Sequence, residues 1–188
     1  MRSLTCLCAL WSLSLLSLTA QPVSTQIDAE NSVISYTGSA VLHDFTGVSH
    51  RVSGPLVVDL AQPQNSRIEI IVPIESFDSG NGNRDSNMLD AVDVDYYPDV
   101  HFVSTTIAPG AAGTWNVQGN LTFHGKTRPV QVPVQVTSDG GVFEGQGTFD
   151  VALSDYKVKR PRLMMVPIDD VIHIAFTVRA PLSPSVTR

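Results

Sequence analysis

Apolar and polar residues alternate along most of the chain after residue 20. The run VQVPVQV at residues 130–136 is the clearest case, and similar alternation surrounds Leu56, Ile70, Leu121 and Ile174. Successive side chains of a β-strand point to opposite faces, so a period of two is typical of a strand with one buried face. No apolar stripe of comparable length with helical spacing follows residue 20. The sequence therefore predicts an all-β domain.

Turn-forming residues divide this pattern into about eight strands. Examples are Pro-Gly at 109–110, His-Gly-Lys at 124–126 and Asp-Gly-Gly at 139–141. Many short strands with little helix predict an antiparallel sandwich or barrel, and a barrel of about eight strands can be packed by side chains or hold one small ligand. A short helix is expected only near residues 84–91.

Three glycines, Gly119, Gly145 and Gly147, fall on inward positions of the predicted strands. Inward glycines either leave room for a ligand or relieve crowding where strands bend. The sequence leaves both interpretations open.

Residues 1–20 have the layout of a secretory signal peptide. Arg2 gives a positive start, Leu4 to Leu18 form a short apolar run, and Ala20 offers a small residue for cleavage. We therefore expect a single mature domain over residues 21–188, exported to the periplasm or the medium. A membrane span needs about 20 apolar residues, so no stable span is expected in the mature form. A retained anchor is the alternative.

Cleavage would also remove both cysteines, Cys6 and Cys8. The mature chain would then have no disulfide, cysteine nucleophile or thiolate metal ligand. Loss of Arg2 takes the formal net charge from −6 to −7. An acidic protein is a poor candidate for binding nucleic acid, and none is expected as a partner.

Sequence signatures of catalysis are missing from the chain. It has no Gly-x-Ser-x-Gly turn, phosphate loop or dinucleotide fingerprint, and its histidines lack metal-site spacing, so we expect no metal, no cofactor and no enzyme. His101 and His173 fall on outward positions, and His124 is expected to bond to the backbone of its turn. His43 with Asp44 could make a polar contact at a cavity rim or, as an alternative, a catalytic dyad.

The segment RDSNMLDAVDVDYYPDVHF at residues 84–102 carries five aspartates. A calcium-binding EF-hand loop needs Gly at its sixth position and Glu at its twelfth. A loop counted from Asp78 has Asn83 and Leu89 there, so the pattern fails. Carboxylates are rarely buried without partners, and we expect these aspartates to face water.

The same segment resembles the signature of the YceI-like family, through R-D, M-L, V-D-V and Y-P in that order. Residues 117–130, which include LTFHGKTRPV, are similar to that family's hairpin motif. Residues 43–56 and 149–176 fit its opening and closing segments. The resemblance covers roughly residues 26–180.

The resemblance implies a lipocalin-like, extended antiparallel barrel, exported, with an apolar tunnel for a polyisoprenoid. Other members of the family are linked to quinone metabolism or stress responses. Residues 84–97 would form a helix-and-loop flap, with Met88, Leu89 and Val92 packed on the barrel. The chain departs from the family pattern at Lys157, where a Gly is expected.

The predicted function is non-catalytic binding of a long apolar ligand, such as a polyisoprenoid or isoprenoid quinone, inside the barrel. A filled barrel that acts only as an interaction or stress protein is the alternative, and a homodimer is left open. Four basic residues within 157–162 would neutralise a pyrophosphate at the barrel mouth. The candidate head-group residues are His43, Lys159, Arg160 and Arg162, and the candidate tunnel residues are Ile70, Phe102, Leu121, Phe123, Val132, Phe149, Ile174 and Phe176.

Overall fold

The computed structural model describes residues 21–40, 43–160, 162–163 and 166–182, and the predicted signal peptide with both cysteines lies outside them. The strands are β1 (Val23–Gln26), β2 (Val33–Ala40), β3 (His43–Ser49), β4 (Pro55–Val58), β5 (Arg67–Pro73), β6 (Asp99–Pro109), β7 (Thr114–Phe123), β8 (Lys126–Asp139), β9 (Val142–Ala152), β10 (Arg162–Leu163), β11 (Val166–Pro167) and β12 (Val171–Pro181). The helices are α1 (Gly82–Ala91) and four 3-10 helices, Ala29–Asn31, Pro63–Asn65, Ile74–Ser76 and Leu153–Tyr156.

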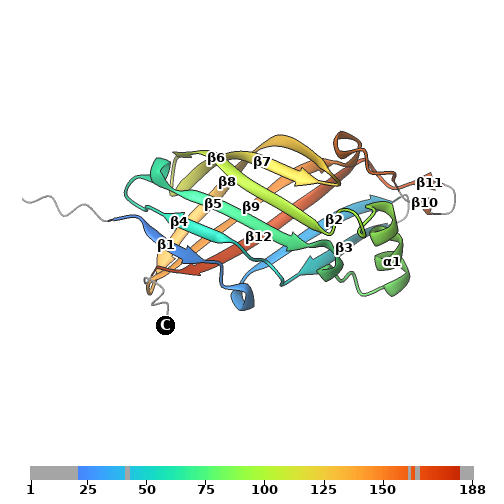
Figure 1. Cartoon of the computed structure of the whole chain (residues 1–188), viewed down its shortest axis with the longest axis horizontal. Coiled ribbons are helices and arrows are strands. Elements are labelled where there is room, and N and C mark those ends of the chain that lie inside the picture. The colour runs from blue at the N-terminus through green and yellow to red at the C-terminus, as the bar shows by residue number, and fades with distance from the viewer. Residues whose placement is uncertain (1–20, 41–42, 161, 164–165, 183–188) are drawn as a thin grey trace, which may run out of the picture.

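Ten strands form one antiparallel sheet in the order β1-β4-β5-β6-β7-β8-β9-β12-β2-β3. The long strands β6 to β9 follow one another as a meander, and β12 joins that meander to the hairpin of β2 and β3. Figure 1 shows the result as an elongated, curled sheet with α1 at one end. The strands β10 and β11 pair separately.

Backbone bonds join the two sides of the curled sheet. Val48 and Asp78 exchange two bonds of 2.9 Å, and Ser53 and Ile71 exchange bonds of 3.0 and 2.8 Å. Strands β3 and β4 therefore act as two parts of one long strand. This strand runs beside β5 and beside the residues that follow β5, up to Asp78. The predicted antiparallel barrel of about eight strands is confirmed, with β1 added beside β4.

The predicted alternation is visible strand by strand. On β7 the buried residues are Trp115, Val117, Gly119, Leu121 and Phe123, and the residues between them face outward. The inward side chains make two adjoining clusters, one around Trp115 and one around Phe123. The inner face of the sheet is thus the core of the protein.

The inward glycines make room for neighbouring rings and backbone. A Cβ atom on Gly119 would lie 2.3 Å from the Phe102 ring and 2.6 Å from the Val103 carbonyl oxygen. A Cβ atom on Gly147 would lie 2.7 Å from the Pro133 carbonyl oxygen and 3.0 Å from the Phe176 ring. Relief of crowding explains Gly119 and Gly147, whereas Gly145, whose added Cβ atom would come no closer than 3.2 Å to the Val134 side chain, lies on the wall of the interior cavity and leaves room there.

The alternation of Leu56 and Val58 would place Leu60 inward as well, but Leu60 is 44% exposed. The strand stops because the Asp59 carboxylate accepts bonds from the Ala61 and Gln62 amides, at 3.0 and 2.8 Å, and so starts a turn. Aspartate commonly bonds its own backbone two residues on, and here that overrides the alternation.

The short helix is confirmed as α1, which begins at Gly82. The Asn81 side chain caps it by accepting a bond from the Arg84 amide at 3.1 Å. Val92 is buried, and Met88 and Leu89 pack beside it against the barrel, as predicted for the flap.

The aspartates of this segment are exposed at Asp90, Asp93, Asp95 and Asp99. Asp85 departs from the expectation, because its carboxylate accepts bonds from the amide and hydroxyl of Ser79. This contact ties the first turn of α1 to the segment that leads into it.

We predict that Gly119→Ala lowers the free energy of unfolding by about 1–3 kcal/mol, because the added methyl group meets a ring and a carbonyl oxygen. The matched control is Gly82→Ala, where no atom lies within 4 Å of the added methyl group. That control should be neutral or stabilise α1 by about 0.5–1 kcal/mol. Urea unfolding measures both changes, and equal stability of the two variants would contradict the tight approach.

Candidate functional site

A cavity of about 560 Å³ lies inside the barrel. Ligand pockets in proteins commonly have volumes of about 300–1,000 Å³. Both hydrophobic clusters contribute to its wall, so the interior is not completely filled by side chains. All eight predicted tunnel residues line it: Ile70, Phe102, Leu121, Phe123, Val132, Phe149, Ile174 and Phe176.

The barrel end near β1 is filled by packed side chains. Trp115 and Phe143 pack there with ring centroids 5.8 Å apart. Ile107 and Ala180 are buried in the same cluster but are not part of the cavity wall. The cavity is thus bounded at this end by packed side chains.

The opposite end of the cavity is covered by α1 and is more polar. Arg84, Asn87, Met88 and Ala91 of α1 line the cavity, as do Asn83 and the capping residue Asn81. Helix residues three and four apart, such as Arg84, Asn87, Met88 and Ala91, share one face. Sequence reasoning did not assign a ligand role to this face, although the spacing from Met88 back to Arg84 was available as a signal.

Arg84 is held in a defined position. Its Nε donates to the Ser79 hydroxyl at 2.8 Å, and its Nη2 donates to the Ser79 carbonyl at 2.7 Å. Its guanidinium also lies over the Phe45 ring, 5.3 Å from the centroid, in a cation–π contact. A cationic side chain is therefore fixed at the polar end of a largely apolar cavity.

Tyr36 was also not assigned to the site from the sequence. It is 9% exposed, and it lines the cavity from β2. Its ring packs edge-on against Phe77 with centroids 5.3 Å apart, and against Phe45 at 6.4 Å. The alternation predicted its inward position but gave no sign of what its hydroxyl would meet.

His43 lines the cavity at the start of β3, as expected for a contact at the rim. Asp44, the next residue on that strand, is not part of the described wall. Adjacent strand residues point to opposite faces, so the proposed His43–Asp44 dyad is not assembled.

The basic segment reaches the cavity wall only through Val158, and its described basic side chains point elsewhere. Lys159 and Arg160 are exposed, and neither lines the cavity. Arg160 turns instead toward the loop before β12, with its Nη1 donating to the Ile168 carbonyl at 3.1 Å and its Nε 3.8 Å from an Asp170 carboxylate oxygen. The Arg162 side chain lies outside the described part of the chain.

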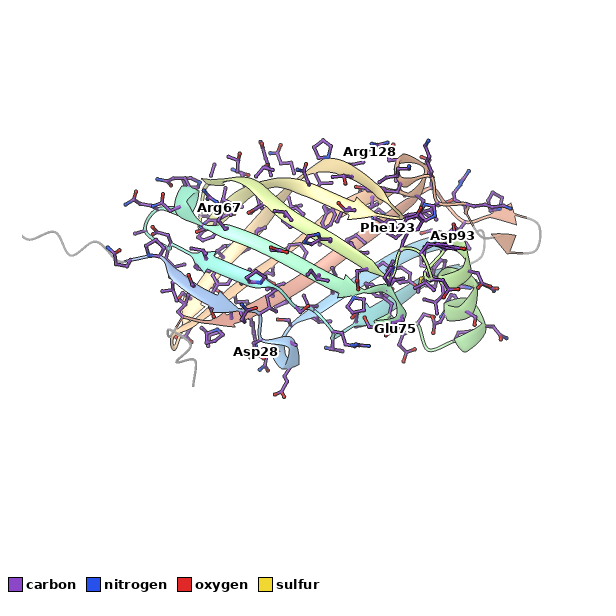
Figure 2. All side chains as sticks on the ribbon, viewed as in Figure 1. Asp28, Arg67, Glu75, Asp93, Phe123 and Arg128 are labelled. Carbon is purple, nitrogen blue, oxygen red and sulfur yellow. The ribbon has the colours of Figure 1, made fainter. Side chains whose placement is uncertain are left out.

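Three of the four stretches that carry the family resemblance, residues 84–102, 117–130 and 149–176, meet at one corner of the barrel. His124 Nδ1 lies 2.9 Å from the Tyr156 carbonyl oxygen, and its Nε2 lies 3.2 Å from the Asp93 carboxylate. The Tyr97 ring packs edge-on against the imidazole. Figure 2 shows Asp93 beside α1, on the same side of the molecule as Phe123 at the end of β7.

This corner corrects the expectation for His124. Its partners are the Tyr156 carbonyl and Asp93, not the backbone of its own turn. Its side chain is only 12% exposed. The contact fixes the segment after α1 against the rest of the barrel, and so holds one wall of the cavity in place.

His101 and His173 point outward, as predicted. His101 Nε2 lies 2.9 Å from Glu69, and His173 Nδ1 lies 2.6 Å from Asp150. Both pairs are substantially exposed, and exposed ion pairs contribute little stability. Neither histidine belongs to the cavity wall described here.

We predict that His124→Ala lowers the free energy of unfolding by about 1–3 kcal/mol, because the buried Tyr156 carbonyl loses its side-chain partner. Amide exchange should become faster in residues 82–97, which this contact holds.

The control for that prediction is His173→Ala, which removes an exposed histidine–aspartate pair. It should cost less than about 1 kcal/mol and leave exchange in residues 82–97 unchanged. Equal effects of the two variants on this segment would show that the buried contact does not hold it.

Lys157 occupies a left-handed backbone conformation, with φ of 59° and ψ of 26°, directly after the 3-10 helix Leu153–Tyr156. This conformation costs a non-glycine residue roughly 1–2 kcal/mol. The family pattern has Gly at this position. The backbone of Lys157 is therefore strained where a Gly would not be.

We predict that Lys157→Gly raises the free energy of unfolding by about 0.5–1 kcal/mol, because the relief of strain exceeds the added entropy of the unfolded chain. Lys159→Gly is the control, since its φ is not positive, and it should not stabilise. Thermal unfolding compares them, and a lower melting temperature for Lys157→Gly would contradict the strain.

Comparisons with known proteins agree with this architecture. A family model described as YceI-like domain matches residues 26–180. UPF0312 proteins of Pseudomonas putida and Pseudomonas savastanoi are 32% and 30% identical over 136 residues, which are 68% of this chain and 69% of each relative. The resemblance predicted from the sequence is confirmed.

Solved structures show the same fold. BcnA of Burkholderia cenocepacia superposes with a TM-score of 0.76 at 26% identity, over 81% of this chain and 98% of that one. A polyisoprenoid-binding domain from Saccharophagus degradans superposes with a TM-score of 0.70 at 14% identity, over 87% of this chain and 100% of that one. The second likeness shows the fold alone.

Among the residues that the structure describes, no helix has both the length and the apolar character needed to cross a membrane.

Proposed function

The chain belongs to the YceI-like family, and from that premise we propose that it is an exported, non-catalytic protein that binds a long apolar ligand inside its barrel. A polyisoprenoid, an isoprenoid quinone or a similar lipid is the ligand class. The observation that carries this proposal is the cavity of about 560 Å³, walled mainly by aliphatic and aromatic side chains.

The driving force would be the removal of apolar ligand surface from water. Each buried methylene contributes about 0.8 kcal/mol, so a long hydrocarbon tail needs few polar contacts to bind well. The wall is formed by strands held in one hydrogen-bonded sheet, so little of it has to become ordered on binding. Preorganisation of this kind preserves affinity.

The Saccharophagus degradans structure supports this ligand class, because it is described as a polyisoprenoid-binding domain. Its low identity means that the ligand of this chain has to be tested directly. The UPF0312 relatives carry no ligand in their names.

Catalysis is not part of the proposal. An enzyme needs a nucleophile, a base and a stabilising group that converge on one place. The pair that the sequence offered, His43 and Asp44, is not assembled on the cavity wall. Binding without chemistry is the simpler use of such an interior.

Export is the part of the proposal that rests on the sequence alone. Residues 1–20 have the features of a secretory signal peptide and lie outside the described structure. Intact mass measurement of the protein recovered from an exported fraction would test cleavage after Ala20.

Mass spectrometry of an organic extract tests the ligand directly. We expect the purified mature protein to release an isoprenoid lipid or quinone in near-stoichiometric amount. A clean extract, together with no uptake of added isoprenoids, would contradict the proposal and favour a protein that works only through macromolecular partners.

A pair of neighbouring variants on β12 provides the control. Ile174 lines the cavity, whereas Ala175 is exposed on the outer face. We expect Ile174→Trp to fill part of the cavity and reduce the bound lipid several-fold, and Ala175→Trp to retain it. Equal lipid content in the two folded variants would place the ligand outside the barrel.

A further inference from the structure

Three separate parts of the chain converge on the imidazole of His124. The turn between β7 and β8 carries the histidine, the segment after α1 carries Asp93, and the 3-10 helix Leu153–Tyr156 contributes the Tyr156 carbonyl. The imidazole is mostly buried, whereas the Asp93 carboxylate is mostly exposed. One side chain therefore connects the end of α1 to two other parts of the barrel.

The backbone of all three parts is strained in the same way. Asp93, His124 and Lys157 have φ of 50°, 48° and 59°, in the left-handed region that favours glycine. Among the described residues, Ala112 is the one other non-glycine residue with positive φ. Strained residues of this kind persist where the surrounding structure holds them, and they cluster at ligand clamps and switches. The corner therefore has the character of a movable contact.

Asp93 is unfavourable for the helix that it follows. It comes directly after the C-cap residue Val92, at the left-handed position that glycine commonly takes. The bond from the Val94 amide to the Leu89 carbonyl, 3.2 Å long, shows that this cap is formed. The C-terminal end of a helix carries partial negative charge and favours cations, yet Asp93 places a carboxylate there. The compensating contact is the one with His124.

The imidazole faces two hydrogen-bond acceptors. Nδ1 lies 2.9 Å from the Tyr156 carbonyl oxygen, and Nε2 lies 3.2 Å from an Asp93 carboxylate oxygen. A neutral imidazole has a single N–H, whereas the imidazolium donates from both nitrogens. Only the protonated ring can therefore serve both acceptors. A neutral ring that keeps its bond to the buried carbonyl turns a lone pair of Nε2 toward the carboxylate.

Other titratable groups surround the imidazole without sharing its contacts. They are Asp95 and Tyr97 beside Asp93, Lys126 and Arg128 on β8, and Asp155, Tyr156 and Lys157 around the 3-10 helix. In the described part of the chain, none of these side chains makes a hydrogen bond or an ion pair with the imidazole. Histidine is the side chain that ordinarily changes charge between about pH 5 and pH 8. A pH change in this range therefore acts on the corner through His124.

The helix that precedes Asp93 is held by few buried contacts. No residue of α1 is fully buried, and its apolar side chains Met88 and Leu89 are only partly buried against the barrel. Elements with little buried apolar surface are the first to open. One face of α1 lines the cavity, so movement of α1 would uncover that end of the interior.

We propose that His124 and Asp93 form a proton-dependent latch, in which the imidazolium holds α1 closed over the cavity and loss of the proton loosens it. The contact is complete at acidic pH and weakens as the pH rises. The use of this latch to control access to the cavity rests on the proposed function, whereas the latch itself is measurable without a ligand.

Hydrogen exchange of the ligand-free mature protein tests the latch. Protection factors are compared at two pH values, because they correct for the intrinsic exchange rate at each pH. We expect the protection of residues 82–97 to fall about fivefold between about pH 5.5 and pH 8, the size expected for one hydrogen bond to a charged group that is partly exposed. Protection in the core strand β7 should stay unchanged.

The variant Asp93→Asn removes the charge but keeps a side chain that tolerates a left-handed backbone. We expect its protection of residues 82–97 to be the same at both pH values. Asp150→Asn is the matched control, because it removes the charge from the exposed pair with His173. It should keep the full pH dependence of the wild type.

Release of a bound probe tests the consequence for the cavity. The protein is loaded with farnesol and mixed with phosphatidylcholine vesicles, and transfer of farnesol to the vesicles is followed at the same two pH values. We expect transfer from the wild type to be about fivefold faster at the higher pH, in proportion to the loss of protection. Transfer from Asp93→Asn should be equally fast at both.

Each contrary outcome has a distinct meaning. Protection of residues 82–97 that does not depend on pH, or depends on it equally in Asp93→Asn, would overturn the latch. Loss of the pH dependence in His43→Gln but not in Asp93→Asn would place the responsible proton at the cavity rim and would also overturn it. A latch that responds to pH while farnesol transfer does not would overturn the control of access. Failure to take up farnesol would count against the proposed function, and hydrogen exchange would still decide on the latch.

Discussion

The rest of the structure depends on one constraint: backbone hydrogen bonds close the curled antiparallel sheet into a barrel. The paired backbone bonds of Val48 with Asp78 and of Ser53 with Ile71 bring β3 and β4 beside β5. Once the sheet curls round, every inward side chain faces other inward side chains. The interior volume is then set by the strands, and side chains fill only part of it.

The two ends of that interior differ in chemistry. Aromatic and aliphatic side chains around Trp115 fill one end, and α1 covers the other with amides and a guanidinium. The corner of His124, Asp93 and the Tyr156 carbonyl holds the segment after α1 in place. An apolar molecule with one polar end would match this asymmetry.

Much of the wall could be predicted because strand parity is a local property. Ile70, Phe102, Ile174 and the other predicted tunnel residues needed only a period of two to be placed inside. Leu60 shows where that reasoning fails, because the bonds of Asp59 start a turn that parity cannot register. The cluster of basic residues that includes Lys159 and Arg160 suggested a head-group site in the sequence. In the structure, however, Arg160 turns toward the loop before β12.

The sequence by itself determined the all-β class, the short helix, the inward face of most strands and the family. Alternation and motif spacing are properties of neighbouring residues, so they can be recognised without the tertiary structure. Only the tertiary structure decided which inward residues surround open space, and which polar groups meet at the α1 end. Tyr36 and Arg84 are 48 positions apart, and nothing local links a strand tyrosine to a helix arginine. Their approach depends on how the sheet curls and where α1 packs, and those are set by long-range pairing.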